Sequence, residues 1–434
     1  MSSFIIQGNA SLSGDIVPQG AKNEALQVLC AVLLTPEKVR INNLPDIRDV
    51  KRLIEILIAL GVDVTPIDRN TYEFQAKDIN FTYLQSPEFV KISGAIRASI
   101  MILGPLLGRF GKAYAARPGG DKIGRRPLNA HFEGFQALGA EFSYNSKTTL
   151  YELSANQLEG KYILLSEASV TGTANVVMAA VMAHGTTTIF NAACEPYLYQ
   201  LCTMLNKMGA KISGIGSNLL TIEGVEYLGG CEHTILPDMI EIGSFIGMAA
   251  LTRSELTIKN CGVPHLGIIP SVFRKLGIQL DIQGDDIHIP HQEEYEVETN
   301  MDGSILTVSD APWPGFTPDL ISIVLVTAIQ AKGSVLIHQK MFESRLFFVD
   351  KLKEMGAQII LCDPHRATVI GLNRKYQLRG TTMDSPDIRA GVSLLLAALS
   401  ADGYSRINNC EQIDRGYQDI VQRLNALGAV IVRE

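Results

Sequence analysis

One segment gathers an unusual amount of positive charge. Residues 109–126, RFGKAYAARPGGDKIGRR, hold six basic side chains and a single acidic one, Asp121. Because the whole chain carries a net charge of -7, this local reversal indicates a site for phosphate or another multiply charged anion. A Pro-Gly-Gly run at 118–120 makes the segment pliable, as expected of a loop that closes over a substrate. Composition alone leaves open a basic turn with Asp121 as an ordinary turn residue.

A second set of charged and polar side chains recurs near predicted helix starts and turns. If such helices run parallel, their N-termini converge and their free N–H groups create an anion site. Any one of these residues alone is more often a helix cap or a solvated charge, so it is their recurrence that favours a function. Near helix starts lie Lys22, Asn23, Arg97, Ser169, Thr173, Asp238, Glu241, Asp319, Asp387 and Arg389, and in turns lie Asp121, Arg126, Glu195, Arg345 and Arg415.

The elements that carry these residues repeat six times. Each copy contains a signal such as ALGVDV at 59–64 or EMGAQI at 354–359, which predicts the end of a helix, a left-handed glycine cap and a strand. The spacing varies only between 68 residues (Gly209 to Gly277) and 79 residues (Gly277 to Gly356). The six glycines are Gly61, Gly139, Gly209, Gly277, Gly356 and Gly428.

Turns and helix starts recur at similar distances before these glycines. A turn precedes each glycine, and a helix start precedes each turn, as in AKNEAL before NNLPDI. A hairpin is expected after the first glycine, with VDVTPI and TYEFQA joined across IDRN. The unit therefore reads as a leading strand, helix, strand, helix, strand and strand, which predicts an α/β fold of six βαβαββ units.

The ends of the chain predict how these units close into domains. The last copy stops at VIVRE without a hairpin partner, and the N-terminal FIIQG and LSGDIV supply strands with no unit before them. We therefore expect one domain at 21–235, carrying a mobile loop around 117–127, and a second made of 1–20 plus 236–434. The active site is expected in the cleft between them.

Composition excludes several classes of protein. With 46% hydrophobic and 19% charged residues the chain is typical of a globular protein, and its longest apolar run, 176–183, is too short to span a membrane. The start lacks the pattern of a signal peptide, and the seven cysteines are scattered without a Cys-x-x-Cys pair. We therefore expect a cytoplasmic enzyme without membrane insertion, metal, cofactor or nucleic-acid partner. The sequence does not indicate an oligomeric state.

Several segments together resemble the enolpyruvyl transferase family, and within it the members that act on UDP-N-acetylglucosamine. The resemblance runs in order along the whole chain. Its family fold, two inside-out α/β domains of three repeats each, agrees with the six-fold count. The segments are GAKNEAL at 20–26, RASIMILGPLLGRFG at 97–111, RPGGDKIGRRPLNAHFEGFQALGA at 117–140, SVTGTANVVMAA at 169–180, EGVEYLGG at 223–230, LPDMIEIGSF at 236–245, MFESRLF at 341–347, PDIRAGVSLLLAA at 386–398 and IDRGY at 413–417.

The resemblance implies transfer of the enolpyruvyl group of phosphoenolpyruvate to the 3-hydroxyl of UDP-N-acetylglucosamine, with release of phosphate. This reaction is the first committed step of peptidoglycan synthesis, and so of cell-wall biogenesis, cell shape and cell division. Two alternatives are a 5-enolpyruvylshikimate-3-phosphate synthase, whose early basic-serine motif is missing here, and a catalytically silent paralogue that binds the UDP-sugar and regulates wall synthesis.

The resemblance also implies residue roles. Lys22, Arg126 and Arg415 would bind phosphate, Arg345 and Arg389 the carboxylate of phosphoenolpyruvate, and Asp319 would be the base for the sugar hydroxyl. Asp387 would lie near the reacting centre, with its role left open. The nucleotide-sugar site would be lined by Asn23, Arg97, Arg126, Pro127, Leu128, Asn129, Ala130, Ser169, Val170 and Met341.

Asp121 departs from the family pattern. Most members have cysteine here, as the general acid in PGGC, whereas this chain reads PGGD. A free aspartic acid has a pKa of about 4, which is too low for a good acid at neutral pH. We expect loop closure beside the substrate's phosphate and carboxylate to restore a protonated Asp121, because nearby negative charge raises a carboxyl pKa.

Overall fold

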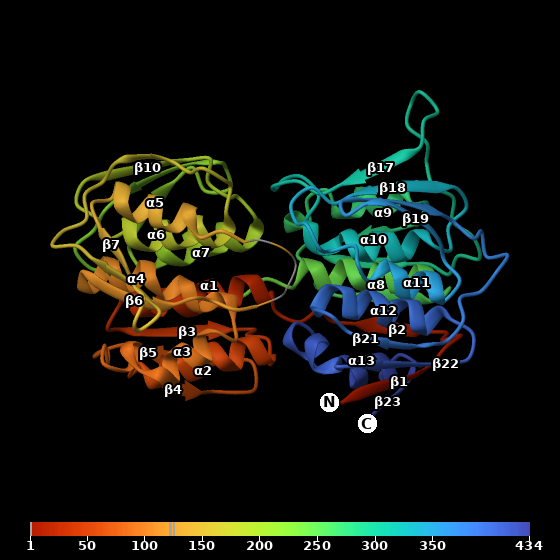
Figure 1. The fold of residues 1–434 in the computed structure, drawn as a ribbon, viewed down its shortest axis with the longest axis horizontal. Coiled ribbons are helices and arrows are strands. Elements are labelled where there is room, and N and C mark those ends of the chain that lie inside the picture. Colours follow the sequence, from red (N-terminus) through yellow and green to blue (C-terminus); the bar gives the residue numbers. More distant parts are fainter. Residues whose placement is uncertain (1, 121–123, 125) are drawn as a thin grey trace. The chain divides into compact units, whose positions relative to one another are not determined.

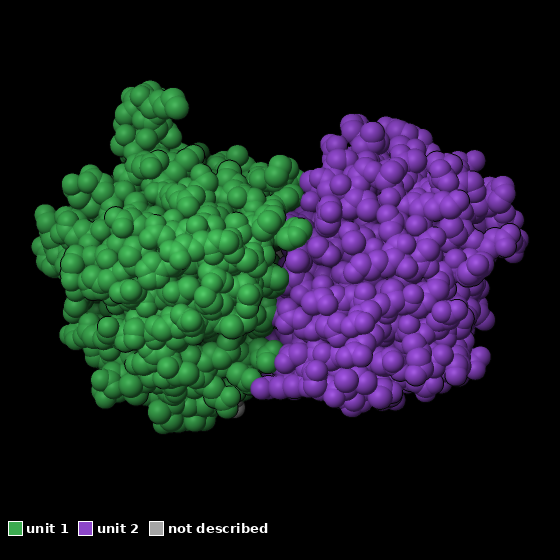
Figure 2. Space-filling model, turned by 180° about the vertical axis from the view of Figure 1, so that it is seen from behind, with its two compact units in different colours: residues 1–19, 122–125, 237–434 green, residues 20–121, 126–236 purple. Residues whose placement is uncertain are grey.

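The computed structural model describes residues 2–120, 124 and 126–434. Two compact units divide the chain (Figures 1 and 2). Unit 1 contains the described residues of 1–19 and 237–434 together with Gly124, and unit 2 contains 20–120 and 126–236. Among the described residues, direct connections between the units lie between Gln19 and Gly20 and between Leu236 and Pro237. Asp121 lies outside the described residues.

Two sheets of unit 2 follow one pattern, in which a leading strand runs parallel to the first strand of a repeat and the remaining neighbours are antiparallel. One sheet has the order β13 (Cys231–Thr234), β3 (Lys38–Asn42), β5 (Tyr72–Gln75) and β4 (Asp63–Pro66), and another β11 (Lys211–Ser213), β12 (Leu219–Glu223), β10 (Thr186–Phe190) and β9 (Tyr162–Leu164). The third sheet has the order β6 (Lys112–Ala116), β8 (Leu150–Ser154) and β7 (Glu141–Asn145).

Unit 1 repeats this pattern in its own sheets. Their orders are β15 (Asp281–Gln283), β16 (Asp286–Ile289), β14 (Glu255–Ile258) and β2 (Ser13–Ile16); β17 (Leu306–Ser309), β18 (Ser334–His338), β20 (Arg366–Ile370) and β19 (Gln358–Asp363); and β21 (Thr382–Asp384), β22 (Tyr404–Asn408), β1 (Ser3–Gln7) and β23 (Val430–Arg433).

The first helix of each repeat lies inside its unit. These helices are apolar around most of their circumference, as expected of helices without a solvent face, and nearly all of their residues are buried. Strands such as β3 and β10 instead alternate buried and exposed residues, so each sheet turns one face outward (Figure 1). The inner helices are α1 (Lys22–Ala31), η3 (Arg97–Ile102) continuing into α4 (Leu103–Phe110), α6 (Val170–Ala180), α8 (Met239–Leu251), η5 (Pro318–Leu320) continuing into α10 (Ile321–Ala328), and α12 (Ile388–Ser400). Helices inside and sheets outside confirm the predicted inside-out fold.

The second helix of each repeat keeps one exposed face and ends at the predicted glycine. All six glycines have positive φ, between 90° and 111°, which confirms the left-handed caps. A strand follows each one, although β15 begins only at Asp281, after the segment IQL predicted to start it. These helices are α2 (Arg48–Ala59), α5 (Asn129–Ala137), α7 (Pro196–Lys207), α9 (Ile269–Lys275), α11 (Val349–Glu354) and α13 (Ile420–Ala426).

The N-terminal strands complete unit 1. β1 pairs antiparallel with both β22 and β23, taking the place of the hairpin strand that the last repeat lacks. β2 pairs parallel with β14, and β13 does the same with β3 in unit 2. The strand directly before each connection thus belongs to a different unit from the helix that follows it.

The second repeat departs from the common pattern. Its sheet has three strands among the described residues, and a short helix, α3 (Pro87–Ser93), occupies the stretch before Arg97 where other repeats have a leading strand. Ser86 caps α3 by accepting from the N–H of Phe89, and Pro87 at the first helical position favours this start. The remaining short helices are η1 (Val32–Leu34), η2 (Tyr83–Gln85), η4 (Val263–His265) and η6 (Cys410–Arg415).

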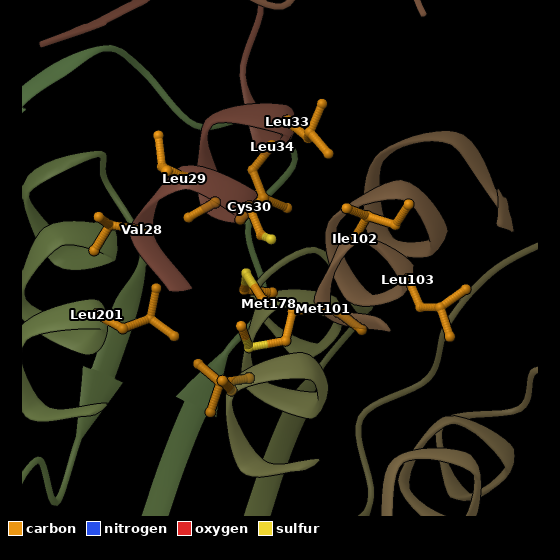
Figure 3. Packing of buried hydrophobic residues seen from close by; sticks show 14 of the residues in the cluster. Val28, Leu29, Cys30, Leu33, Leu34, Met101, Ile102, Leu103, Met178 and Leu201 are labelled. Carbon is orange, nitrogen blue, oxygen red and sulfur yellow. The ribbon is translucent and has the colours of Figure 1, made fainter. Parts of the chain in front are cut away.

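The core of unit 2 shows how the inner helices are held. Side chains from α1, η3, α6 and α7 meet in one apolar cluster that includes Leu29, Cys30, Met101, Met178 and Leu201 (Figure 3). Burial raises the pKa of the Cys30 thiol well above its usual range, so this cysteine behaves as a small apolar residue. Within the described ranges, every helix is too short or too polar to cross a membrane.

Candidate active site

The predicted site residues fall into two groups, one in each unit. In unit 1 these are Asp319, Met341, Arg345, Asp387, Arg389 and Arg415, and in unit 2 they are Lys22, Asn23, Arg97, Arg126, Pro127, Leu128, Asn129, Ala130, Ser169 and Val170. Half of each group, three of six residues in unit 1 and five of ten in unit 2, lies at or just before the starts of inner helices. The remaining predicted residues lie in turns, at the end of η6, or at and just before the start of α5.

A carboxylate held by two guanidinium groups dominates the group in unit 1. Nη2 of Arg345 lies 2.6 Å from Oδ1 of Asp319, and Nη2 of Arg389 lies 3.0 Å from Oδ2. The arginine side chains are only 9% and 8% exposed, and that of Asp319 is 19% exposed. Each oxygen of the carboxylate thus has its own guanidinium donor in a mostly buried setting, where such bonds are strong.

Local structure explains how these side chains meet. Asp319 lies in η5, whose N-cap Thr317 accepts a hydrogen bond from the Asp319 N–H. Arg389 is the second residue of α12, and the N-cap Asp387 accepts from the N–H groups of Arg389 and Ala390. Because α10 and α12 pack together inside the unit, their starts are adjacent.

Asp387 is therefore an N-cap, as the structural interpretation of a helix-start carboxylate predicts. Its Oδ1 lies 2.7 Å from the backbone nitrogen of Arg389. A cap bond at this point fixes the backbone from which the Arg389 guanidinium projects. Asp387 can thus orient the candidate site without contacting a substrate.

The two arginines set the charge state of Asp319. Burial alone would raise the pKa of this carboxyl, but the positive charges of Arg389 and Arg345, with their hydrogen bonds, outweigh burial and hold it well below its usual range. Asp319 is therefore ionised in this arrangement. A carboxylate so strongly stabilised has little tendency to accept a proton.

A buried carboxylate that the sequence did not single out holds the segment with Met341. Asp310, which is fully buried, accepts hydrogen bonds from the Gln339 side chain and from the N–H groups of Lys340 and Met341. Burial holds the pKa of Asp310 above its usual value, although the N–H groups of Lys340 and Met341 lower it in part. Asp310 thereby orients the turn before Arg345. This contact could not be predicted, because Asp310 lies far from that turn in the sequence.

Arg415 lies at the end of η6, which packs against α12. Its Nη1 donates to Oε1 of Gln412 at 2.8 Å. Arg345 also stacks on an aromatic ring, with its guanidinium carbon 4.8 Å from the ring centroid of Phe342. These contacts fix the direction of both guanidinium groups.

In unit 2, Lys22 is the first residue of α1 and is largely buried. Its ammonium lies 2.7 Å from Oδ2 of Asp49, in the first turn of α2, and the two side chains are 9% and 5% exposed. Asn23 follows on the same helical turn. The Lys22–Asp49 pair was not predicted, because the sequence does not reveal that the two helix starts are neighbours.

Arg97 organises the segment that leads into α5. Its Nη2 donates to the carbonyls of Arg126 at 3.1 Å and Pro127 at 3.3 Å. Burial, and then the charge of Arg126, lower the pKa of Arg97 to about 10. Within the described residues its Nε, also buried, has no hydrogen-bond partner. The structure thus joins Arg97 to the predicted run Arg126–Ala130.

The starts of α5 and α6 approach closely. Ser169 caps α6 by accepting from the N–H of Gly172, as a capping interpretation of this serine predicts. A Cβ on Gly172 would lie 3.0 Å from that of Ser169 and 3.1 Å from that of Ala130. The predicted residues Ser169, Val170 and Ala130 therefore gather at one place in the unit.

A buried histidine that sequence reasoning missed supports this place. The ring of His131 lies 2.9 Å from the side-chain nitrogen of Asn175 and 3.1 Å from the hydroxyl of Thr171. Burial, and then the charge of Arg97, lower the pKa of His131 to about 3, so the ring is neutral near pH 7. His131 and Asn175 thus fix the beginning of α6 relative to α5. Only the resemblance segment that contains His131 hinted at its importance.

Comparisons with known proteins agree with this architecture. The sequence profile described as EPSP synthase (3-phosphoshikimate 1-carboxyvinyltransferase) matches residues 6–424. Proteins named UDP-N-acetylglucosamine 1-carboxyvinyltransferase are 64% identical in Bacteroides thetaiotaomicron and Bacteroides fragilis and 63% identical in Porphyromonas gingivalis, in each case over 433 residues and the full length of both chains.

Solved structures share the fold at much lower identity. The enolpyruvyl transferase NikO from Streptomyces tendae has a TM-score of 0.87 and 23% identity, covering 100% of this chain and 99% of NikO. An EPSP synthase from Acinetobacter baumannii has a TM-score of 0.74 and 16% identity, covering 100% of both chains. With the profile match over most of its length and relatives at 63–64% identity, the chain belongs to the EPSP synthase family of enolpyruvyl transferases.

Proposed function

We propose that the protein transfers the enolpyruvyl group of phosphoenolpyruvate to the 3-hydroxyl of UDP-N-acetylglucosamine and releases phosphate. The relatives at 63–64% identity over the full length bear the name of this activity. In the structure, the observation that carries the proposal is the pair of buried guanidinium groups, from Arg345 and Arg389, arranged around one carboxylate. Such a pair can receive the carboxylate of phosphoenolpyruvate.

The donor substrate requires cations for two anionic groups. Arg345 and Arg389 hold its carboxylate in this proposal, and Lys22, Arg126 and Arg415 bind its phosphate. Guanidinium groups suit both tasks because their planar donors match carboxylate and phosphate oxygens. Negative charge that develops on the departing phosphate is stabilised by the same cations.

The acceptor substrate occupies the surface at the starts of α5 and α6. Arg97 fixes the carbonyls of Arg126 and Pro127, and Ser169 and Val170 begin α6 close to Ala130. In the proposal these residues line the nucleotide-sugar site together with Asn23, Leu128, Asn129 and Met341. Asp387 supports the reacting centre through the backbone of Arg389.

The chemistry is an addition followed by an elimination. Asp319 takes the proton of the sugar hydroxyl while the sugar oxygen bonds to carbon 2 of phosphoenolpyruvate. Asp121 supplies a proton to the methylene carbon. The resulting ketal then loses phosphate, and the new methyl group returns a proton to the protein as the double bond forms again. Atoms balance, because the sugar gains the enolpyruvyl group and the hydroxyl proton leaves with phosphate or solvent.

The cellular role follows from the activity. We propose that the enzyme acts in the cytoplasm at the first committed step of peptidoglycan synthesis, and so supports cell shape and division. Its proposed domains are 21–235 and 1–20 plus 236–434.

Phosphate release tests the proposed function. Purified protein is mixed with phosphoenolpyruvate and either UDP-N-acetylglucosamine, shikimate 3-phosphate or no acceptor. We expect phosphate only with the UDP-sugar. Release with shikimate 3-phosphate would favour the other transferase activity, and binding of the UDP-sugar without phosphate release would favour a regulatory paralogue.

A further inference from the structure

The carboxylate site formed by Arg345 and Arg389 is already filled by a carboxylate of the protein. Asp319 offers one oxygen to each guanidinium, at 2.6 and 3.0 Å. Within this group of three side chains, two positive charges face one negative charge. The protein thus shows directly that these two guanidinium groups can bind a carboxylate placed between them.

This arrangement conflicts with the two roles that the proposed function gives to the same residues. Arginines that hold Asp319 have fewer donors for a substrate carboxylate. Asp319, while held by both arginines, is a poor acceptor for the proton of a sugar hydroxyl, because the pairing stabilises its ionised form. A simple exchange of partners removes both conflicts.

We propose that Asp319 is a stand-in for the donor carboxylate, which displaces it from Arg345 and Arg389 and so converts it into the base for the acceptor hydroxyl. This inference rests on the proposed function. After exchange, two guanidinium groups face two carboxylates, so the charges of the three side chains and the donor carboxylate sum to zero. The second negative charge and the loss of guanidinium donors both make Asp319 more basic.

Other groups near the arginines leave this exchange intact. Asp310 acts on Arg345, but it is engaged by Gln339 and by the N–H groups of Lys340 and Met341. Tyr417 faces Arg389 and hydrogen-bonds to Ser244, and burial raises the pKa of its hydroxyl to about 12, so it stays neutral. Asp319 is therefore a carboxylate that competes directly with the substrate.

The exchange has a consequence for the order of events. Without a donor carboxylate, Asp319 stays paired and the acceptor hydroxyl keeps its proton. Once the donor is bound, the base is available at the place where the hydroxyl must attack. The same contact that recognises the donor thus activates the acceptor. The acceptor hydroxyl therefore loses its proton only when the donor is bound.

Removing the Asp319 charge provides an unusual test, because loss of a catalytic base should then strengthen donor binding. Calorimetry compares the wild type and Asp319→Asn for binding of 2-phospholactate, which has the phosphate and carboxylate of the donor but no double bond. Saturating UDP-N-acetylglucosamine is present throughout. We expect binding to the variant to be about ten-fold tighter, since the two arginines no longer hold an internal carboxylate.

Two controls identify the cause. Asp350→Asn removes an exposed carboxylate of α11 that pairs with Lys353, and it should leave the affinity for 2-phospholactate unchanged. Inorganic phosphate, which lacks a carboxylate, should gain much less affinity from Asp319→Asn than 2-phospholactate does. Equal or weaker binding of 2-phospholactate by Asp319→Asn would overturn the exchange, and equal gains for both ligands would overturn it as well.

A spectroscopic measurement does not depend on the affinity of a variant. In protein labelled with ¹³C at the aspartate carboxyl carbons, the signal missing from Asp319→Asn identifies Asp319. Its titration midpoint should rise by about one pH unit or more when 2-phospholactate saturates the wild type. An unchanged midpoint in a protein that still releases phosphate would reject the exchange and leave the proposed function standing, whereas absence of any 2-phospholactate binding would contradict both.

Discussion

The two units hold the arginines of their candidate sites in different ways. In unit 1, Arg345 and Arg389 share the carboxylate of Asp319. In unit 2, Arg97 donates to the carbonyls of Arg126 and Pro127, which are neutral dipoles, and burial beside the charge of Arg126 lowers its pKa to about 10.

The difference indicates what each set of cations can bind. A guanidinium pair that already holds a carboxylate is shaped for another carboxylate and must exchange partners to receive it. A guanidinium held by carbonyls keeps its charge available for an anion and also fixes the backbone around it. Lys22 is the exception in unit 2, since it lies 2.7 Å from Asp49 and so resembles the paired arginines of unit 1.

The largest effect is expected from breaking the arginine pair. Arg389→Ala leaves Asp319 and the donor carboxylate with one guanidinium, so kcat/KM for phosphoenolpyruvate should fall about 100- to 1,000-fold, or about 3–4 kcal/mol. Initial rates of phosphate release measure this change. Arg366→Ala, which removes an exposed arginine paired with Asp363, should alter the rate less than two-fold. A loss below ten-fold for Arg389→Ala would contradict the role of the pair.

A smaller effect is expected in unit 2. Arg97→Lys keeps the charge but loses the planar donors that reach two carbonyls, so KM for UDP-N-acetylglucosamine should rise about ten-fold while kcat changes little. Steady-state kinetics with each substrate varied separates the two constants. If kcat fell and KM stayed constant, Arg97 would act on the chemical step rather than on acceptor binding.

The neutral His131 makes the stability of the protein depend on pH. Its native pKa of about 3 lies below the ordinary value of 6.5, so below pH 6.5 the unfolded chain binds a proton that the native protein does not. This contribution to stability is present above pH 6.5 and is lost as the pH falls towards 3, at up to about 1.4 kcal/mol per pH unit. Urea unfolding at several pH values should show a shallower decline for His131→Gln than for the wild type. Parallel declines would show that His131 is not the titrating group.

The smallest effect should be equal in both units. Gly209 in unit 2 and Gly356 in unit 1 both have a φ of 105°, and a Cβ would meet nothing within 4 Å at the first and only the side-chain nitrogen of Arg379, at 4.0 Å, at the second. Alanine at either position should cost about 1–2 kcal/mol through backbone strain alone. Unfolding curves measure this cost, and KM should not change. Clearly unequal costs would show that packing, rather than the turn, distinguishes the two sites.

Much of the fold was predictable because it follows from local signals. A few residues suffice to predict the six glycine caps, the helix starts and the missing hairpin strand after VIVRE. β1 occupies the expected place beside β22 and β23. The exception in the second repeat, where α3 replaces a leading strand, also has local causes in Ser86 and Pro87, but these are common residues without a distinctive pattern.

The partners within the site were not predictable from spacing. Asp49, Asp310 and His131 contact residues that lie far away in the sequence or on another helix. The sequence does not distinguish such a carboxylate or imidazole from others of its kind, because only the fold brings it to its partner. The grouping of Asp319 with Arg345 and Arg389 was implied by the family resemblance alone. That Asp319 itself fills the space between the two arginines emerges only from the structure.

The most direct test of the account follows the carbon that is transferred. With phosphoenolpyruvate labelled with ¹³C at carbon 2 and UDP-N-acetylglucosamine in excess, NMR should show the label moving to a vinyl ether carbon on the sugar 3-oxygen, one for each phosphate released. Label that stays in phosphoenolpyruvate, or that appears in pyruvate through hydrolysis, would contradict the proposed transfer.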